Sequence, residues 1–267
     1  MSADPRPPDP AVRIRPAATV MLLRDGAAGP EVFVLQRVAS MAFAGGMTAF
    51  PGGGVDDRDQ VTPDWAGPAP DWWADRFAAD SVLAAAVVTA AVRELFEETG
   101  VLLADLPPGS AATDPAVRED LRRGIVGHRT GIEALGATIR ADLLRPWARW
   151  VTPPGQPRRY DTFFLAAVAP AGAEPQLLTT EAEIGRWVRP QDALDAGRKG
   201  EIALMPPTVA MLSDLAALPS ATDLLQIDRR VHPASPRVIS AEGESVVVRF
   251  GDHEFGALGM PVPPMTS

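Results

Sequence analysis

Short apolar runs rich in β-branched residues recur along the chain, and turn-forming residues separate them. The segments AATVMLLR (17–24) and EVFVLQR (31–37) flank DGAAGP, which predicts two strands joined by a turn. MTAFPGGGVDD (47–57) predicts a short strand that runs into a glycine-rich turn. Further strands are predicted at WARWVTP (147–153), YDTFFLAAVAP (160–170) and IGRWVRP (184–190), and a closing hairpin at RVISA (237–241) and SVVVRF (245–250).

The segment from Ser81 to Thr99 has the periodicity of a helix. Its apolar residues recur at helical spacing and form one stripe: Val88, Val92, Leu95 and Phe96. Asp80 or Ser81 can cap the start of this helix, and Gly100 can end it. We therefore expect a single helix with one apolar face directed at a core.

Two other segments are also predicted to be helical. They are residues 115–144, with a break near GHRTG, and residues 206–218, which begin with proline. Residues 54–80 combine proline, glycine and aspartate with three tryptophans, which predicts an irregular insertion anchored by packed aromatic rings. Residues 1–12 are rich in proline and aspartate and are expected to be disordered. The mixture predicts an α/β or α+β fold with helices packed on a mixed sheet.

The composition narrows the classes of function. The chain has no cysteine, which excludes disulfides, thiolate metal sites and cysteine nucleophiles. Its net charge is −9 and no basic tract stands out, so we expect neither nucleic acid nor a membrane as a partner. No apolar signal region begins the chain, and the longest apolar run is too short to span a bilayer, so we expect a cytoplasmic protein.

One turn of the helix at 81–99 carries an unusual density of charge. Glu94, Glu97 and Glu98 fall within an arc of about 100°, opposite the apolar stripe. The like charges at i and i+4, close to the C-terminus of the helix, oppose both each other and the helix dipole. A cation would compensate both effects, and oxygen ligands without cysteine or histidine favour Mg²⁺ or Mn²⁺. Arg93 precedes Glu97 by one turn and can hold its carboxylate. The alternative is a solvated acidic face.

The residues around this turn carry a family resemblance. RELFEETGV (93–101) is similar, position for position, to the REUXEEXGU half of the Nudix box GX5EX7REUXEEXGU, in which U is aliphatic, and FPGGG resembles the entry to that box. The resemblance implies an α/β/α sandwich with a central mixed sheet, and hydrolysis of nucleoside diphosphates linked to another group. It also implies four metal ligands, the Gly53 carbonyl and the carboxylates of Glu94, Glu97 and Glu98, oriented by Arg93.

The spacing of the box departs from the family pattern. The pattern places thirteen residues between its first glycine and its arginine, whereas thirty-nine separate Gly53 from Arg93, an excess of twenty-six. Counted back from Arg93, the first glutamate falls at Ala85 and is absent, and Asp56 is the nearest acid that can replace it. We therefore expect residues 13–267 to form a single Nudix domain with insertions at about 57–80 and 104–146. Our hypothesis for the first insertion is a lid or a dimer element.

The presence of an insertion inside the box resembles one subgroup of the family, the coenzyme A diphosphatases. LQRVASMAFAGGMTAFPGG (35–53) keeps part of that subgroup's signature, while Ala44 replaces its histidine and Thr48 an aliphatic residue. The resemblance implies cleavage of coenzyme A or an acyl-CoA to 3′,5′-ADP and (acyl-)4′-phosphopantetheine. ADP-ribose, NADH and other nucleoside diphosphate derivatives remain alternative substrates.

Arginines and glutamates outside the helix complete the candidate site. Arg37, Arg158 and Arg159 are candidates for binding the phosphates of a nucleotide, because a guanidinium pairs with phosphate through two parallel hydrogen bonds. The candidate catalytic residues are Glu98, Glu97 and Arg93, with Glu181 and Glu183 as further candidates for the general base. The three histidines have no ligand spacing and are expected to be structural or exposed: His128, His232 and His253.

Two further assignments stay open at this level. A sensor with the same fold and no catalysis is an alternative from another class, which the complete REUXEEXGU half of the box argues against. The expected partner is a small-molecule nucleotide, and a homodimer is left open.

Overall fold

The computed structural model describes residues 12–39, 45–61, 63–128, 130–154, 156, 158–235, 237–242, 245–250 and 253–255. The disorder predicted for residues 1–12 falls, apart from Val12, outside the described residues, as does Ala44.

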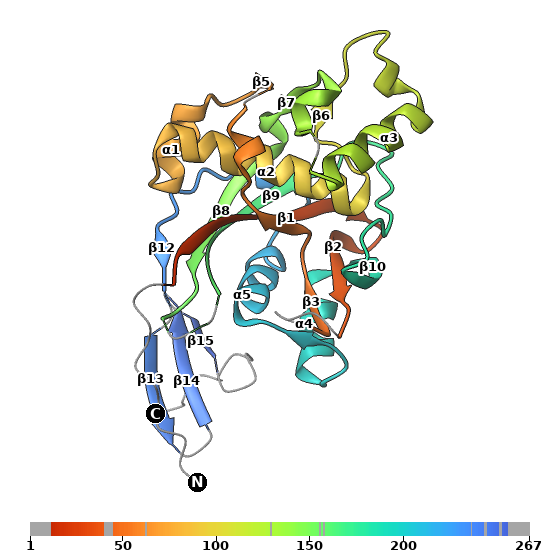
Figure 1. The fold of residues 1–267 in the computed structure, drawn as a ribbon. Coiled ribbons are helices and arrows are strands. Elements are labelled where there is room, and N and C mark those ends of the chain that lie inside the picture. Colours follow the sequence, from red (N-terminus) through yellow and green to blue (C-terminus); the bar gives the residue numbers. More distant parts are fainter. Residues whose placement is uncertain are drawn as a thin grey trace.

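A mixed sheet forms the centre of the molecule (Figure 1). Within the described residues its strand order is β11-β3-β2-β1-β9-β8-β12, with β10 paired to β2 and β4 paired to β1. The strands are β1 (Ile14–Gly26), β2 (Gly29–Arg37), β3 (Met47–Ala49), β4 (Gly52–Gly54), β8 (Leu144–Val151), β9 (Arg159–Val168), β10 (Ala182–Val188), β11 (Ala203–Leu204) and β12 (Pro233–Ala234). β1 is parallel to β9 and antiparallel to β2, so the predicted strands and the predicted mixed sheet are confirmed.

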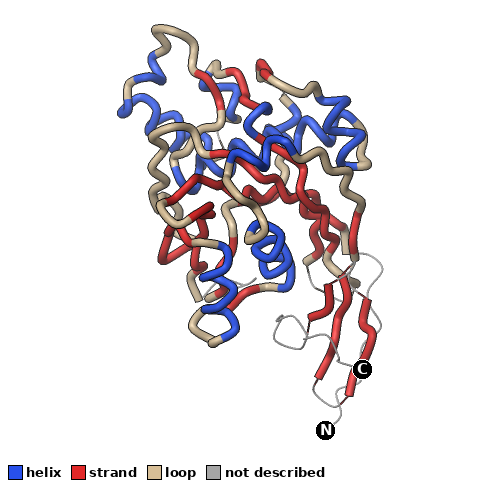
Figure 2. The backbone as a smooth tube through the Cα atoms, turned by 180° about the vertical axis from the view of Figure 1, so that it is seen from behind, coloured by secondary structure: helices blue, strands red, loops and turns tan. Residues whose placement is uncertain are grey.

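Helices cover the two faces of this sheet, as Figures 1 and 2 show from opposite sides. Helix α2 (Ser81–Thr99) packs on one face, and α4 (Pro190–Arg198) and α5 (Pro206–Leu215) pack on the other. Alternation along β1 explains the two cores, because Val20 and Leu22 face α2 while Met21 and Leu23 face α5. The α/β/α sandwich is therefore confirmed.

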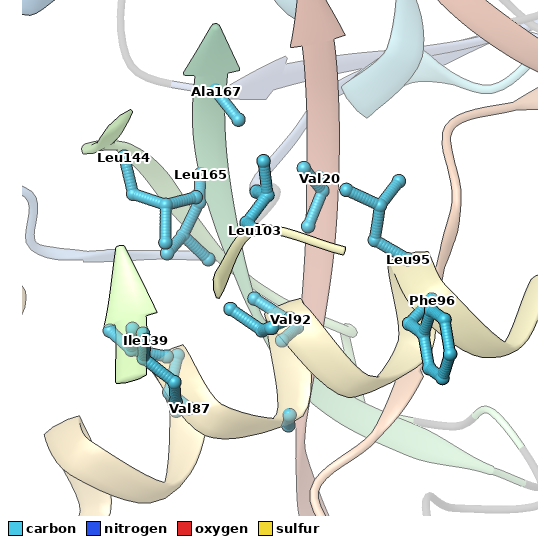
Figure 3. Packing of buried hydrophobic residues seen from close by; sticks show 14 of the residues in the cluster. Val20, Val87, Val92, Leu95, Phe96, Leu103, Ile139, Leu144, Leu165 and Ala167 are labelled. Carbon is cyan, nitrogen blue, oxygen red and sulfur yellow. The ribbon is translucent and has the colours of Figure 1, made fainter. Parts of the chain in front are cut away.

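The predicted boundaries of α2 are also confirmed. The Asp80 side chain accepts a hydrogen bond from the Leu83 N–H (2.8 Å), and Gly100 ends the helix in the left-handed conformation (φ 73°). Figure 3 shows Val92 and Leu95 of α2 packed in the core layer that contains residues of β1 and β9. The apolar stripe thus fixes which face of α2 remains for the acidic residues.

The two insertions have more regular structure than predicted. Residues 54–80 contain η1 (Asp57–Gln60), β5 (Asp64–Ala66) and α1 (Pro70–Phe77). The segment 104–146 contains β6 (Ala104–Asp105), η2 (Ala111–Thr113), α3 (Pro115–Val126), η3 (Ile132–Leu135), β7 (Thr138–Arg140) and η4 (Ala141–Leu143), and β5, β7 and β6 form a small separate sheet.

Two helix predictions are therefore wrong in part. Residues 115–144 are one helix only as far as Val126, because the glycines at 127, 131 and 136 end or interrupt helical turns that follow. The irregular insertion includes α1, whose start is set by Pro70 in its first turn.

The remaining elements lie toward the C-terminus. They are η5 (Thr222–Gln226) and the strands β13 (Arg237–Glu242), β14 (Ser245–Phe250) and β15 (His253–Phe255). β13 and β14 pair antiparallel, so the closing hairpin is confirmed. Among the described residues, no helix combines the length and the apolar character needed to cross a membrane.

Candidate active site

The glycine strand β4 passes close to the acidic face of α2. β4 pairs with β1, and Gly53 lies beside Ala18 in that register. A Cβ atom on Gly53 would lie 2.5 Å from Oε1 of Glu94, so only glycine fits here without moving that carboxylate. The N–H of Gly52 donates a hydrogen bond of 3.0 Å to Oε2 of Glu98. The absence of side chains on β4 thus lets the backbone touch two of the three glutamates.

Arg93 is the organising residue behind these carboxylates. It is 2% exposed, and each nitrogen of its guanidinium has an acceptor. Nε and Nη2 form a bidentate pair with Asp59 (2.8 and 2.9 Å), and Nη2 also donates to the carbonyl oxygen of Gly54 (2.9 Å). Nη1 donates to Oε1 of Glu94 (2.9 Å) and to Oε1 of Glu97 (3.0 Å). One buried side chain therefore connects α2, β4 and the first insertion.

The electrostatics of the turn follow from burial and from this pairing. Burial raises the pKa of Glu94 to about 7, and the neighbouring Glu97 charge adds to the effect while Arg93 opposes it. Burial also raises the pKa of Glu98 to about 8, with a contribution from Glu94. For Arg93, burial alone would lower the pKa, but the hydrogen bonds to Asp59 and the surrounding carboxylates outweigh it and hold the pKa above its ordinary value. The surroundings of Glu94 and Glu98 therefore disfavour the charged forms of both carboxylates.

Each of the last four carbonyl groups of α2 has a hydrogen-bond donor, although the carbonyl groups at the end of a helix lack donors within the regular helix. The pairs are Phe96 with the Gly100 N–H (2.9 Å), Glu97 with Nη1 of Arg122 (2.7 Å), Glu98 with the Leu178 N–H (2.9 Å) and Thr99 with the Gln176 N–H (2.9 Å). Arg122 belongs to α3 and is itself held by a bidentate pair with Glu119 (2.7 and 2.8 Å). The second insertion therefore fixes the turn that carries Glu97 and Glu98.

The acidic turn lines a cleft of about 1510 Å³. An apolar part of its lining comes from Phe50, Trp150, Phe164, Met205 and Pro206. The cleft is large enough for a nucleotide-sized molecule, since pockets for such ligands span about 300–1,000 Å³. It therefore combines carboxylates, backbone groups and an apolar surface.

Arg37 lies at the end of β2 beside this turn. Its Nη2 is 3.5 Å from Oε2 of Glu181, and its Nε atom is buried with no hydrogen-bond partner among the described residues. Its charge acts on Glu98, where it lowers the pKa against the effect of burial. Arg37 thus presents a cation to the cleft next to the carboxylates.

The comparisons with known proteins agree on one family. No protein-family model matches the chain. A Nudix hydrolase of known structure from Alicyclobacillus acidocaldarius is 30% identical, with a TM-score of 0.67, and the match covers 82% of this chain and 99% of that one. The chain belongs to the Nudix hydrolase family. As a Nudix enzyme, it is a hydrolase of the diphosphatase class, which confirms the resemblance seen in its sequence.

Two curated Nudix proteins are similar over most of the chain. The putative Nudix hydrolase 7 of Caenorhabditis elegans is 28% identical over 242 residues, which cover 89% of this chain and 75% of that protein. The acyl-coenzyme A diphosphatase NUDT19 of Homo sapiens is 32% identical over 200 residues, which cover 66% of this chain. The match spans about half (48%) of the length of the human protein.

Within this Nudix domain, most of the predicted site residues line one cleft. They are Gly53, Arg93, Glu94, Glu97 and Glu98, together with Arg37, Arg158 and the alternative base Glu181. They come from β2, β4, α2 and the segments before β9 and β10, so the fold brings residues from outside the box to the same cleft as the box residues.

Two predicted residues do not line the cleft. Arg159 follows Arg158 at the start of β9, and successive residues of a strand face opposite sides, so its Nε donates instead to the Thr152 carbonyl oxygen (3.0 Å). Glu183 sits at the register shift between Ala182 and Ile184 in the pairing of β10 with β2, and it is exposed outside the cleft. The structure thus places Glu183 outside the cleft, and Arg159 in an adjoining cavity that Arg158 also lines.

Asp59 is the residue that the sequence reasoning missed. Counted forward from Gly53, the GX5E half of the box ends at residue 59, where this chain has aspartate. Asp59 is fully buried, and both its carboxylate oxygens accept hydrogen bonds from Arg93. The twenty-six excess residues of the box thus follow its first acidic position, Asp59. Counting back from Arg93 placed that position at Ala85 because the count ignored the insertion. Asp56, the substitute that we considered, instead caps η1.

Three further residues line the cleft but were not predicted from the sequence to be part of the site. His128, expected to be structural or exposed, lines the cleft with its Nδ1 3.2 Å from Oδ2 of Asp56. Arg13 and Arg15, at the start of β1, line the same cleft. The alternation of β1 could have identified the two arginines, because they share a strand face with Ala17 and Thr19.

The donor groups of the turn fit a divalent cation of the kind that Nudix hydrolases generally use. Carboxylate and carbonyl oxygens are the ligands of hard cations, and a cation would stabilise the charged forms of Glu94 and Glu98. As the side chains stand, no three acidic or imidazole groups of the described residues are arranged to hold a metal ion, and Arg93 contacts one oxygen, Oε1, of Glu94 and of Glu97. A cation would therefore use the second oxygen, Oε2, of each of these carboxylates while Arg93 holds the first.

Proposed function

We propose that this Nudix enzyme is a metal-dependent diphosphatase that cleaves the diphosphate linkage of a nucleotide derivative, with coenzyme A or an acyl-CoA as its favoured substrate. The observation that carries the proposal is the meeting of Glu94, Glu97 and Glu98 with the backbone of β4 in one nucleotide-sized cleft. A small-molecule nucleotide is accordingly the proposed partner.

The proposed metal is Mg²⁺ or Mn²⁺, held by the Gly53 carbonyl and by the carboxylates of Glu94, Glu97 and Glu98. When bound, such an ion would neutralise diphosphate charge and polarise the phosphorus–oxygen bonds. Arg93 would orient the carboxylates, since its contacts to Asp59 leave its Nη1 directed at Glu94 and Glu97.

Glu98 is the proposed general base. It lies in the cleft, and its Oε2 accepts a hydrogen bond from the Gly52 N–H (3.0 Å), which fixes one carboxylate oxygen beside the glycine strand. In the reaction, water would lose a proton to the base as its oxygen bonds to one phosphorus atom, and the bond from that phosphorus to the bridging oxygen would break. Each of the two products would keep one phosphate of the former diphosphate. Arg37 is the proposed contact for the diphosphate because its charge acts on Glu98 and its Nε has no hydrogen-bond partner among the described residues.

Two observations favour coenzyme A among the alternatives. The first is the 32% identity with a human acyl-coenzyme A diphosphatase, which adds to the partial signature at residues 35–53. The second is the apolar lining from Phe50, Trp150 and Phe164, a surface suited to a pantetheine or acyl chain. ADP-ribose and NADH are the alternative substrates, for which the same carboxylates and Arg37 would serve.

A mixed-substrate assay tests the proposal. The purified protein is incubated with Mg²⁺ or Mn²⁺ and equimolar coenzyme A, acetyl-CoA, NADH and ADP-ribose, and each compound is followed by mass-resolved chromatography. We expect 3′,5′-ADP to appear together with phosphopantetheine or its acetyl form. Cleavage of NADH or ADP-ribose alone would overturn the coenzyme A assignment and leave the metal site standing. Cleavage of no compound with either metal would contradict the proposal.

A further inference from the structure

Three arginines line the cleft at the end of the sheet where β1 and β9 begin. Arg13, Arg15 and Arg158 are exposed, and none of them forms an ion pair or hydrogen bond with another described residue. Several arginines elsewhere among the described residues pair with carboxylates, as Arg76 does with Asp228 and Arg149 does with Asp161. The arginines of this cluster are therefore available to an anion from outside the chain.

Strand register brings the three arginines together. β1 and β9 run parallel with Ile14 beside Arg159 and Arg15 beside Tyr160, so Arg13 and Arg158 immediately precede the first pair. Arg13 and Arg15 are two residues apart and face one side of the strand. Arg158 reaches the same cleft from the neighbouring strand, and all three also line an adjoining cavity of about 460 Å³, together with Arg159, whose Nε donates to the Thr152 carbonyl oxygen. The fold thus gathers three guanidinium groups at one place on the cleft wall.

This cluster is separate from the acidic turn. Ala18 lies beside Gly53 in the register of β1 with β4, and Gly53 contacts Glu94. At about 3.3 Å per residue, the Cα atoms of Arg15 and Arg13 lie about 10 Å and 16 Å along β1 from that position. If the diphosphate of a substrate lies at the carboxylates, these arginines would therefore be free to bind a different part of the same substrate.

We propose that Arg13, Arg15 and Arg158 form a second anion site, which binds a phosphate monoester that the nucleotide carries in addition to its diphosphate. This inference rests on the proposed function. It selects substrates whose ribose is itself phosphorylated, such as coenzyme A, over those with a free ribose, such as ADP-ribose and NADH. Arginine suits this task because its planar fork matches the oxygens of a phosphate.

A binding measurement without metal tests the site independently of catalysis. The probes are 3′,5′-ADP and 5′-AMP, which differ by one monoester phosphate, and affinity is measured by calorimetry. We expect the wild-type protein to bind 3′,5′-ADP about tenfold more tightly, the size of one favourable charged contact. The double variant Arg15→Gln with Arg158→Gln should bind the two probes alike. Arg186→Gln, an exposed position of β10 outside the cleft, is the control and should keep the preference.

Kinetics separate this inference from the proposed function. For the wild type, the KM for coenzyme A should be about tenfold below that for dephospho-coenzyme A, with similar kcat. The double variant should raise only the KM for coenzyme A. Equal affinities of the wild type for the two probes, or equal loss of both in the double variant, would overturn the second anion site. Failure of the wild type to cleave any diphosphate while the binding preference holds would overturn the proposed function alone.

Discussion

At the residue scale, the site depends on how closely a bare backbone approaches a carboxylate. Gly53 and Gly54 are neighbours on β4, but a Cβ on Gly53 would meet Glu94 at 2.5 Å, whereas a Cβ on Gly54 would have no atom within 4 Å. The two glycines thus form a natural pair for measuring what that approach contributes.

We predict that Gly53→Ala reduces turnover at least tenfold, because the added methyl group must displace the Glu94 carboxylate. Mn²⁺ affinity, measured by calorimetry, should fall with it. Gly54→Ala is the matched control and should change either quantity by no more than about twofold, as for a substitution without steric conflict. Equal effects of the two substitutions would show that the approach to Glu94 does not matter.

Asp59 and Arg93 form a buried pair whose halves come from the insertion and from α2. Removing Asp59 leaves the buried Nε of Arg93 without its acceptor, while Glu94 and Glu97 still accept from Nη1, and breaking a buried pair costs about 3–5 kcal/mol. We therefore predict that Asp59→Ala lowers the free energy of unfolding by about 3–5 kcal/mol in denaturant titrations. Asp57→Ala, two positions away and exposed, should change it by less than about 0.5 kcal/mol. An unfolding free energy unchanged in Asp59→Ala would contradict the role assigned to the pair.

Much of the candidate site can be predicted at this scale from the sequence. Four box residues lie within one six-residue segment of the chain: Arg93, Glu94, Glu97 and Glu98. Helical geometry alone puts the three glutamates on one face. Asp59 could have been predicted by counting forward from Gly53. Glu183 could not be excluded, because a register shift in β10 is set by pairing with β2 and leaves no mark in the local pattern.

At the element scale, α2 was predictable because its signals are local. A capping aspartate, an apolar stripe and a terminal glycine mark it between Asp80 and Gly100. The partners of its C-terminal carbonyl groups were not predictable, since Arg122 and the segment at 176–178 are distant in the chain. The element is thus defined locally, and its attachment depends on tertiary contacts.

The acidic face of α2 predicts a pH dependence for the metal-free protein. The pKa values of Glu94 and Glu98, about 7 and about 8, exceed the value of 4.5 expected in the unfolded chain, because burial disfavours the charged forms. The folded state therefore binds more protons than the unfolded state, so this contribution is fully present below pH 4.5 and is lost as pH rises through 7 and 8. We predict that, in the presence of a chelator, the Tm decreases as the pH is raised from 5 to 8, the range set by these pKa shifts.

A variant isolates this contribution from that of other titrating groups. Glu98→Gln removes one of the two raised carboxyl groups, so its Tm should fall less over the same pH range. Identical slopes for the wild type and Glu98→Gln in the chelator would contradict the predicted linkage.

At the scale of the whole molecule, the insertions are part of the core. Trp73 is fully buried, and Phe77 packs edge-on against Phe163 of β9 with ring centroids 5.0 Å apart. Our hypothesis of a lid or dimer element for the first insertion finds no support in this packing, because the segment joins α2 to the sheet. Composition indicated the aromatic anchor, but long-range packing decided what it is anchored to.

The central claim concerns the carboxylate turn of α2 as a catalytic centre. The most direct measurement is kcat for coenzyme A cleavage with Mg²⁺ in the wild type, Glu97→Gln and Glu98→Gln, with circular dichroism to verify folding. Our account predicts losses of at least about 100-fold in both variants, the usual effect of removing an acid–base or metal-binding group, with unchanged spectra. Turnover within about twofold of the wild type in folded Glu97→Gln and Glu98→Gln would contradict the account.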